Sequence, residues 1–156
     1  RRNSIYFKRA YLMVDVCLFL LGIIIANVVE YSVHRYLFHG WGKKKKSIFA
    51  FHLREHHLTA RRNKFVDNKI SNKEIFGLPA LLLFFLPLYY LSGALYMGLV
   101  AYAALFFILH NIQHKFPDLA KKYFWWHWNH HMKNQNKSWN VVVPITDVLM
   151  GTLEKR

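Results

Sequence analysis

The feature that most constrains this chain is the distribution of its histidines. All ten lie in four short clusters, at residues 34–39, 52–57, 110–114 and 127–131. Histidines that serve as occasional core or surface polar groups would be scattered, and here none lies outside the clusters. Because neutral imidazole is the commonest metal ligand among side chains, the pattern predicts a fold that gathers the four clusters around bound metal.

Two long apolar segments predict a membrane protein. Residues 10–33 are interrupted only by Asp15, Asn27 and Glu30, and residues 75–109 contain no charged residue. A helix of ~24 residues rises ~36 Å and crosses a ~30 Å hydrocarbon layer, whereas one helix over 75–109 would be ~52 Å long. Pro87 and Ser92-Gly93 therefore predict a hairpin of two short spans within the second segment.

The predicted fold is accordingly all-α, a membrane helical bundle with about three spans and a histidine-rich helical cap. The spans are expected at about residues 10–33, 75–91 and 93–110 of a single integral-membrane domain covering residues 1–156. This organisation puts the polar, histidine-containing segments together on one side of the membrane.

The charge distribution predicts which side that is. The chain has 22 Lys and Arg and a net charge of +14; four of these cations precede the first span and eighteen lie in the two histidine-containing segments. The positive-inside rule then places all four clusters on the cytoplasmic face. Three spans would put the basic N-terminus on the opposite face, a conflict that an earlier span or a re-entrant first helix would remove. A nucleic-acid partner is not expected, because a basic nucleic-acid binder would not contain the uncharged run.

Histidine spacing predicts which rings converge. Residues four apart lie on one face of an α-helix. Three pairs have this spacing: His52 and His56, His110 and His114, and His127 and His131. His130 is expected to join the last pair at i+3. His34 and His39 are five apart, ~140° around an ideal helix, so their convergence requires a local helix end or kink, which Gly40 could provide.

The number of imidazoles predicts two metal ions. Ten exceed the ligand shell of one ion and suit two ions with four or five nitrogens each. The single cysteine, Cys17, lies in an apolar segment and not in a cluster, so thiolate ligands of the structural zinc type are not expected. Imidazole suits Zn, Cu, Fe and Ni, and zinc can occupy an iron site, so the ligand type does not name the metal.

Polar residues near the clusters are candidates for orienting the imidazoles. Glu30 lies one turn before His34, at the membrane edge. Its carboxylate either accepts a hydrogen bond from a ligand histidine or extends to the interface. Asn111 and Asn129 lie inside clusters and are candidate ligands, orienting groups or ordinary polar neighbours.

The clusters together resemble the histidine boxes of a known superfamily. HRYLFH (34–39), HLREHH (52–57), HNIQH (110–114) and HWNHH (127–131) are similar to the boxes of the membrane fatty acid hydroxylase/sterol desaturase superfamily. The tail resembles that superfamily's closing segment, which ends in Asp-x-x-x-Gly-Thr, here Asp147 to Thr152. The resemblance covers about residues 28–153.

The resemblance implies a dinuclear non-haem metal centre, usually iron, that uses O2 and two electrons to hydroxylate or desaturate a lipid C–H bond. The implied ligands are His34, His39, His52, His56, His57, His110, His114, His127, His130 and His131. Asp147 matches the aspartate near the site, and is expected to orient a ligand or face the substrate, or else to cap a turn. No fused cytochrome b5-like module is recognisable, so a separate cytochrome b5- or ferredoxin-type electron donor is expected.

Several functions fit the pattern less well than fatty-acyl hydroxylation. The first box also resembles that of bacterial carotenoid β-ring hydroxylases, while the closing segment fits the fatty acid/sphingolipid hydroxylase and sterol-type desaturase or oxidase branches better. A non-enzymatic membrane metal or haem-binding electron carrier would leave most of the histidines idle. A metal transporter would need polar residues along its spans, and residues 75–109 offer few besides Ser92 and tyrosines. A zinc hydrolase would carry His-Glu-x-x-His, which is absent from the sequence.

Overall fold

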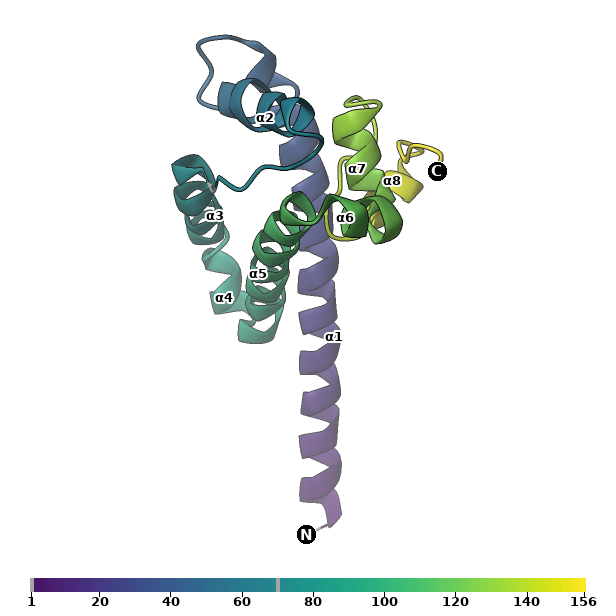
Figure 1. Ribbon diagram of the computed structural model, residues 1–156. Coiled ribbons are helices and arrows are strands. Elements are labelled where there is room, and N and C mark those ends of the chain that lie inside the picture. The colour runs from purple at the N-terminus through teal and green to yellow at the C-terminus, as the bar shows by residue number, and fades with distance from the viewer. Residues whose placement is uncertain (1, 70) are drawn as a thin grey trace. The chain divides into compact units, whose positions relative to one another are not determined.

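The computed structural model describes residues 2–69 and 71–156, and the side chains of residues 9–69, 71–73 and 75–156. The regular elements in these residues are all helices, which confirms the all-α prediction for this part of the chain (Figure 1). In chain order they are α1 (Arg2–Ser32), η1 (Val33–Phe38), η2 (Trp41–Lys43), η3 (His52–His57), α2 (Leu58–Arg62), α3 (Asn72–Phe84), α4 (Pro87–Leu91), α5 (Gly93–Lys115), α6 (Pro117–Tyr123), α7 (Trp125–Met132) and α8 (Ile145–Leu149).

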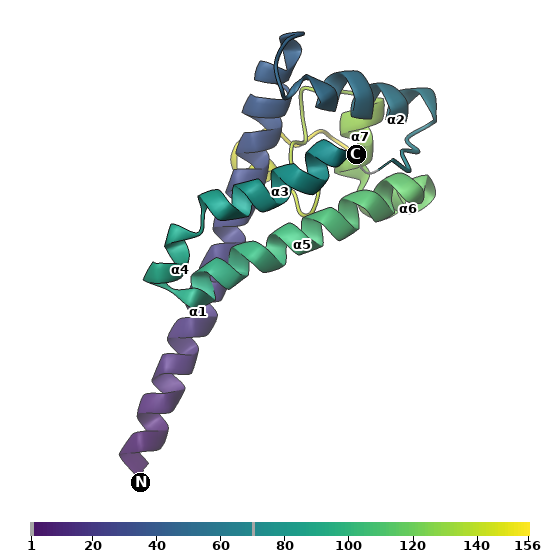
Figure 2. The same cartoon turned by 90° about the vertical axis from the view of Figure 1, so that its left-hand side faces the viewer.

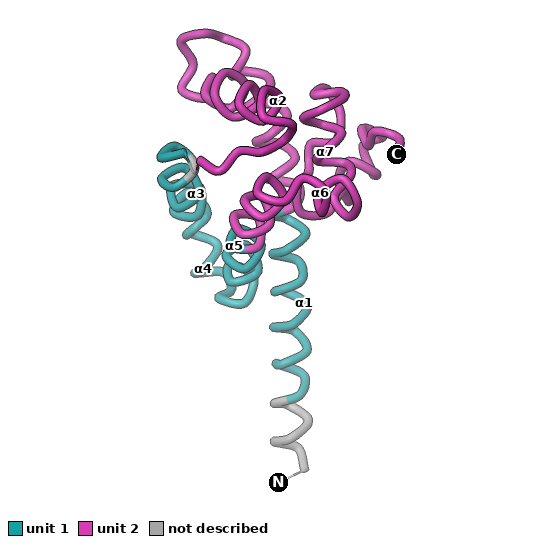
Figure 3. Tube along the Cα trace, viewed as in Figure 1, with its two compact units in different colours: residues 1–26, 71–104 teal, residues 27–70, 105–156 magenta. Residues whose placement is uncertain are grey.

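The helices form two compact units that are interleaved along the chain (Figure 3). One unit comprises residues 1–26 and 71–104, and the other comprises residues 27–70 and 105–156. Helices α1 and α5 each begin in the first unit and end in the second. The two units therefore do not correspond to two consecutive stretches of sequence.

Helices α1 and α5 are the two described helices that are long and apolar enough to cross a membrane. The expected spans at 10–33 and 93–110 both fall within them. In the first unit their backbones cross in contact. A Cβ added at Gly22 would lie 2.1 Å from the Leu95 carbonyl oxygen, and one at Gly98 would lie 2.2 Å from that of Phe19. Small residues that let two backbones approach are typical of helix pairs in membranes.

The third span expected at 75–91 is not confirmed. The chain bends at Phe85 and Leu86, between α3 and α4, just before Pro87. Proline has no backbone N–H to donate to the carbonyl four residues earlier, and its ring clashes with that carbonyl. The Leu83 carbonyl instead accepts from the Leu86 N–H, which ends the α-helical pattern before Pro87. Helix α3 has 13 residues and rises only ~20 Å, less than the ~30 Å of a hydrocarbon layer. The chain turns between α4 and α5 (Figure 2). At this turn the Ser92 hydroxyl accepts a hydrogen bond from the Leu95 N–H and so caps the start of α5.

The second unit contains every histidine and the C-terminal segment, residues 139–147. This segment is irregular up to α8, yet Trp139, Asn140, Val141, Val142 and Asp147 are all buried. Polar side chains of α1 bind it, because Asn27 donates to the Val143 carbonyl (2.9 Å) and accepts from the Thr146 hydroxyl (2.7 Å). A segment with little regular hydrogen bonding is thereby held in one conformation.

Candidate metal centre

The structure brings all ten histidines together in the second unit, and each is at most 7% exposed. Their ring nitrogens divide into two groups. In the first histidine group the nitrogens lie within 4.8 Å of one another; its members are His34, His39, His52, His57 and His130. The second histidine group consists of two such triads that share His114; its members are His56, His110, His114, His127 and His131. The rings of His57 and His131 stack across the two groups with centroids 4.0 Å apart.

A π-helical turn brings together His34 and His39, which are five residues apart in the first cluster. Helix η1 is a π-helix, and the His39 N–H donates to the His34 carbonyl at 3.0 Å, five residues back. In such a turn, residues five apart lie nearly above one another, so His34 and His39 reach the same point. The expected local deformation is therefore present. It consists of a π-turn ending at His39 and not of a helix end made by Gly40. Such turns are rare and frequently mark functional sites.

The second cluster also forms a π-helical turn, so the predicted pairing of His52 with His56 is wrong. Helix η3 is also a π-helix, so His52 pairs with His57, five residues away, in the first group. His56 points to the second group instead of joining His52. In the fourth cluster, the pairing of His127 with His131 is confirmed, but His130 joins the first group. The chain thereby distributes neighbouring histidines between two centres.

The nitrogen spacing within the first group fits ligation of one ion. Two nitrogens bound ~2.1 Å from a metal lie ~3.0 Å apart at a right angle and ~3.4 Å apart at a tetrahedral angle. The observed Nε2–Nε2 distances are 3.0 Å for His34–His52, 3.1 Å for His39–His57, 3.2 Å for His52–His57 and 3.1 Å for His39–His130. In the second group His56 and His110 are 3.3 Å apart.

Hydrogen bonds at Nδ1 fix the tautomers of several rings. A carbonyl oxygen can only accept, so a ring nitrogen bonded to one carries the proton and leaves the Nε2 lone pair free. The bonds of this kind run from His34 to Trp139 O, from His114 to Phe65 O, from His127 to Gln113 Oε1 and from His130 to Lys137 O. Such partners of the second ring nitrogen typically orient a metal-ligating histidine.

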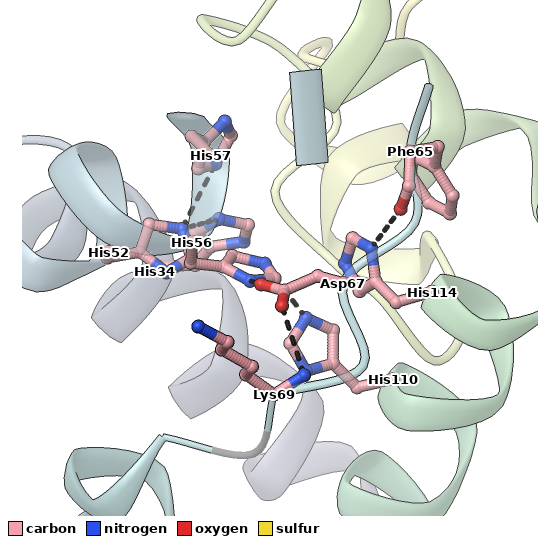
Figure 4. Close-up of polar contacts among 9 residues, drawn as sticks. All are labelled: His34, His52, His56, His57, Phe65, Asp67, Lys69, His110 and His114. Atoms are coloured by element: carbon pink, nitrogen blue, oxygen red, sulfur yellow. Dashed lines mark hydrogen bonds and ion pairs between the residues drawn. The ribbon is translucent and has the colours of Figure 1, made fainter. Parts of the chain in front are cut away.

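Residues of the loop after α2 support the second group (Figure 4). Asp67 Oδ2 accepts from His56 Nδ1 at 3.0 Å, and its other oxygen accepts from the Lys69 N–H. Phe65 stacks its ring on His114, with centroids 4.4 Å apart, and provides the carbonyl bonded to that ring. Phe65 and Lys64 have positive φ angles of 82° and 53°. Left-handed backbone at non-glycine residues costs about 1–3 kcal/mol each and clusters at functional sites.

Burial keeps the histidines outside the long apolar helices neutral. It lowers the pKa of His52, His56 and His57 well below the ordinary value, and neighbouring histidines lower it further. The same two causes lower the pKa of His127 and His131. Neutral rings at pH 7 have lone pairs available for a metal. Unpartnered buried nitrogens remain, among them both nitrogens of His131 and Nε2 of His114 and His127; without an ion their desolvation would be uncompensated.

Two carboxylates hold the C-terminal segment. Glu30 accepts from the Val141 N–H (2.7 Å) and from the Asn140 side chain (3.0 Å). These bonds explain how the carboxylate is accommodated at the end of α1. Buried Asp147 accepts from the N–H groups of Trp139 (2.9 Å) and Asn140 (2.7 Å). Its burial raises its pKa, and these hydrogen bonds oppose the rise.

The C-terminal segment thereby supports both groups. Asp147 accepts from the Asn140 N–H, which is in the same peptide group as Trp139 O, and Trp139 O accepts from His34 Nδ1 in the first group. The Val141 carbonyl accepts from Gln113, whose Oε1 accepts from His127 in the second group. Asp147 therefore acts on the centre indirectly, through the backbone.

The two asparagines within the clusters bond elsewhere. Asn111 donates to the Phe107 carbonyl of its own helix at 2.7 Å, and Asn129 donates to the Lys155 carbonyl at 3.2 Å. The supporting residues that the sequence did not reveal are Asp67, Gln113 and the carbonyls of Phe65, Lys137 and Trp139. Gln113 carried only a weak signal, since Asn111 is likewise an uncharged polar residue between His110 and His114. A backbone carbonyl leaves no signal in a sequence.

These observations define a class of site: a buried all-histidine site whose ring nitrogens form groups that could hold metal ions. The orphaned nitrogens, the fixed tautomers and the ring spacings all fit metal ligation. A model of the fatty acid hydroxylase family matches residues 19–152, so the chain belongs to that family.

A characterised relative is the ceramide very long chain fatty acid hydroxylase SCS7 of Saccharomyces cerevisiae. It is 31% identical to this chain over 147 residues, which cover 86% of the chain. The chain spans only 37% of that enzyme's length. No solved structure matches the chain.

Proposed function

We propose that this chain is the catalytic domain of a membrane hydroxylase that inserts oxygen from O2 into a C–H bond of a fatty-acyl lipid. The cofactor is two iron ions held by the first and second histidine groups. Membership of the fatty acid hydroxylase family supports the reaction class. The relative acts, by its name, on ceramide very long chain fatty acids, and an acyl chain of a ceramide-type lipid is the substrate we propose here.

The observation that carries the proposal is the division of ten buried histidines into two converging groups. A haem-binding electron carrier needs two axial histidines, and a single structural ion needs about four ligands. Neither accounts for two sets of five. Bound iron supplies O2 activation and the oxidising power that an unactivated C–H bond requires.

The protein's own contribution is to orient ligands, exclude water and keep rings unprotonated. Trp139 O, Phe65 O and Lys137 O hold the Nδ1 protons of three rings, so Nε2 faces the centre in each. Asp67 supplies a carboxylate to His56. Burial keeps bulk water away from the rings, which suits chemistry in which a reactive oxidant must meet only the substrate.

The proposal includes the membrane and an electron donor. Helices α1 and α5 cross the bilayer, the lipid substrate comes from it, and the metal centre lies on the cytoplasmic face, where the basic histidine-containing segments belong. Two electrons per turnover come from a separate carrier of the cytochrome b5 or ferredoxin type.

The test is metal analysis combined with product analysis. Purified full chain is expected to contain two iron ions per molecule. With a long-chain ceramide, a reductase and electron carrier, and ¹⁸O2, it is expected to yield a hydroxylated acyl chain carrying the heavy isotope. Label from H2¹⁸O instead of ¹⁸O2, or product from chelated protein, would refute the oxygenase.

Two substitutions test the two histidine groups separately. His39→Ala removes a ring from the first group and His127→Ala removes one from the second, so each is expected to lower bound iron and abolish product. Asn136→Ala, at an exposed loop residue, is the control and should change neither. Full activity of both histidine variants would contradict the proposal.

A further inference from the structure

Helix α8 carries an apolar outer face that the metal centre does not use. Ile145, Val148, Leu149 and Met150 are exposed, with Leu149 77% accessible, while Thr146 and Asp147 point inward and are buried. From Trp139 to Leu153 the sequence has no charged residue other than the buried Asp147. Clustered exposed apolar side chains on a folded protein mark a contact surface.

Hydrogen bonds fix the level of this face along α1. Asn27 binds both sides of the α8 entry, through the Val143 carbonyl and the Thr146 N–H and hydroxyl. Thr152, just after α8, donates to the Tyr31 hydroxyl. Helix α8 is therefore attached to α1 between Asn27 and Tyr31.

That level is the end of the apolar stretch of α1. Before it, Leu20, Ile24 and Val28 are exposed and follow one another at four-residue intervals on one helix face. After it come Glu30 and Arg35. If the exposed apolar face of α1 lies in lipid, α8 lies where hydrocarbon gives way to head groups.

We propose that the outer face of α8 contacts the lipid bilayer and lies in its interface as a short in-plane anchor. The inference rests on the proposed crossing of the membrane by α1. An in-plane helix typically buries its apolar face ~5–10 Å into the boundary of head groups and acyl chains, beside basic residues. Lys155 and Arg156 lie six and seven residues after the end of α8, next to Glu154. Five residues could not form such a helix alone, and the bonds to Asn27 and Tyr31 hold it in place.

The lipid contact also adjoins the centre. Asp147, next to Val148 in α8, holds the Trp139 peptide, and the Trp139 ring lies 5.0 Å from that of His39. Asp147 and Trp139 thereby connect α8 to His39 of the first histidine group.

Spin labelling of the full chain in phosphatidylcholine vesicles tests this placement. Cys17→Ser first removes the native cysteine, the single one in the chain. Nitroxides are then attached separately to Leu149→Cys, Leu20→Cys and Lys45→Cys, all at exposed positions. Collision rates with O2, which partitions into lipid, and with a water-soluble nickel chelate are compared. Retained metal content shows that each variant is folded.

The expected O2-to-nickel ratio at residue 149 is several-fold higher than at residue 45 and approaches that at residue 20. Residue 45 is the aqueous reference. It comes after His39, and His39 lies roughly 15 Å beyond Asn27 along α1 and η1, so residue 45 is expected to lie outside the lipid. A label at residue 149 that collides readily with the nickel chelate would overturn the inference. A label there that is shielded from both reagents would also overturn it, because it would indicate that a second copy of the chain covers α8. A nickel-accessible label at residue 20 would refute the membrane crossing of α1 as well, and so distinguishes the two failures.

Discussion

Asp67 gives the second histidine group a charged partner, whereas His34 and His130 in the first group bond to backbone carbonyls. A carboxylate strengthens a ligand histidine more than a neutral carbonyl does. We expect Asp67→Asn to weaken one of two metal-binding steps by about 10–100-fold, the usual effect of losing such a partner. Competition titration with a chelator measures both steps.

Asp118→Asn is the matched control, because Asp118 is an exposed carboxylate at the start of α6. It should leave both steps unchanged. Equal weakening of the two steps by Asp67→Asn would mean that the carboxylate does not act on one group selectively.

Asp147 acts on the centre through the backbone, and its removal should therefore affect folding first. In Asp147→Asn, one oxygen that accepts from the segment at Trp139 and Asn140 becomes an amide that cannot accept. Losing a buried, charge-assisted hydrogen bond costs about 2–3 kcal/mol, which corresponds to a fall in Tm of about 5–10 °C. Thermal unfolding in detergent, with Asp118→Asn alongside, checks this. An unchanged Tm would show that the segment does not depend on the carboxylate.

At the level of elements, the crossing of α1 and α5 is the contact most sensitive to added volume. A methyl group at Gly22 would meet the Leu95 carbonyl, a backbone atom that cannot rotate away. We expect Gly22→Ala to separate the helices and destabilise the chain by about 1–3 kcal/mol, seen as a lower Tm. Gly77→Ala in α3 is the control, since nothing lies within 4 Å of its added Cβ, and alanine favours the helix there. Equal Tm values for the two variants would argue against the close crossing.

The elements also show what the sequence could and could not predict. Length and apolar composition predicted the helices that became α1 and α5, because a long apolar run with few polar residues leaves few alternatives. Proline at position 87 signalled a break in the second apolar segment. The break lies inside the span expected at residues 75–91 and divides it into α3 and α4. The five-residue spacing of His34 and His39 predicted a local deformation, but neither its π-helical form nor the second π-turn at His52–His57 could be predicted, because no residue type encodes them. They arise when tertiary convergence outweighs ideal α-helical geometry, and the 3.6-residue rule consequently misassigned His56 and His130.

At the scale of the whole molecule, burial of the histidines links stability to pH. The folded pKa values of His52, His56, His57, His127 and His131 lie below the ordinary value near 6.5. The unfolded chain therefore binds more protons than the folded chain below that pH, and stability falls as pH falls. Each such histidine contributes up to about 1.4 kcal/mol per pH unit. We expect the Tm of chelator-stripped protein to be flat above about pH 7.5 and to drop steeply below about pH 6.5.

Metal-loaded protein should hold its Tm to lower pH, because protons must then compete with bound ions. A metal-free Tm that rises on acidification would contradict the burial of neutral rings.

The dependence of both histidine groups on residues 139–147 has a consequence for biosynthesis. Ribosomes make a chain from its N-terminus, so His131, the last of the ten, emerges before Trp139 supplies its carbonyl to His34 and before Asp147 secures that peptide. A nascent chain that already contains every imidazole still lacks the Lys137 and Trp139 carbonyls that orient His130 and His34. Under the proposed function, we therefore expect metal binding to follow the translation of Asp147, when the carbonyls that orient His34 and His130 are in place.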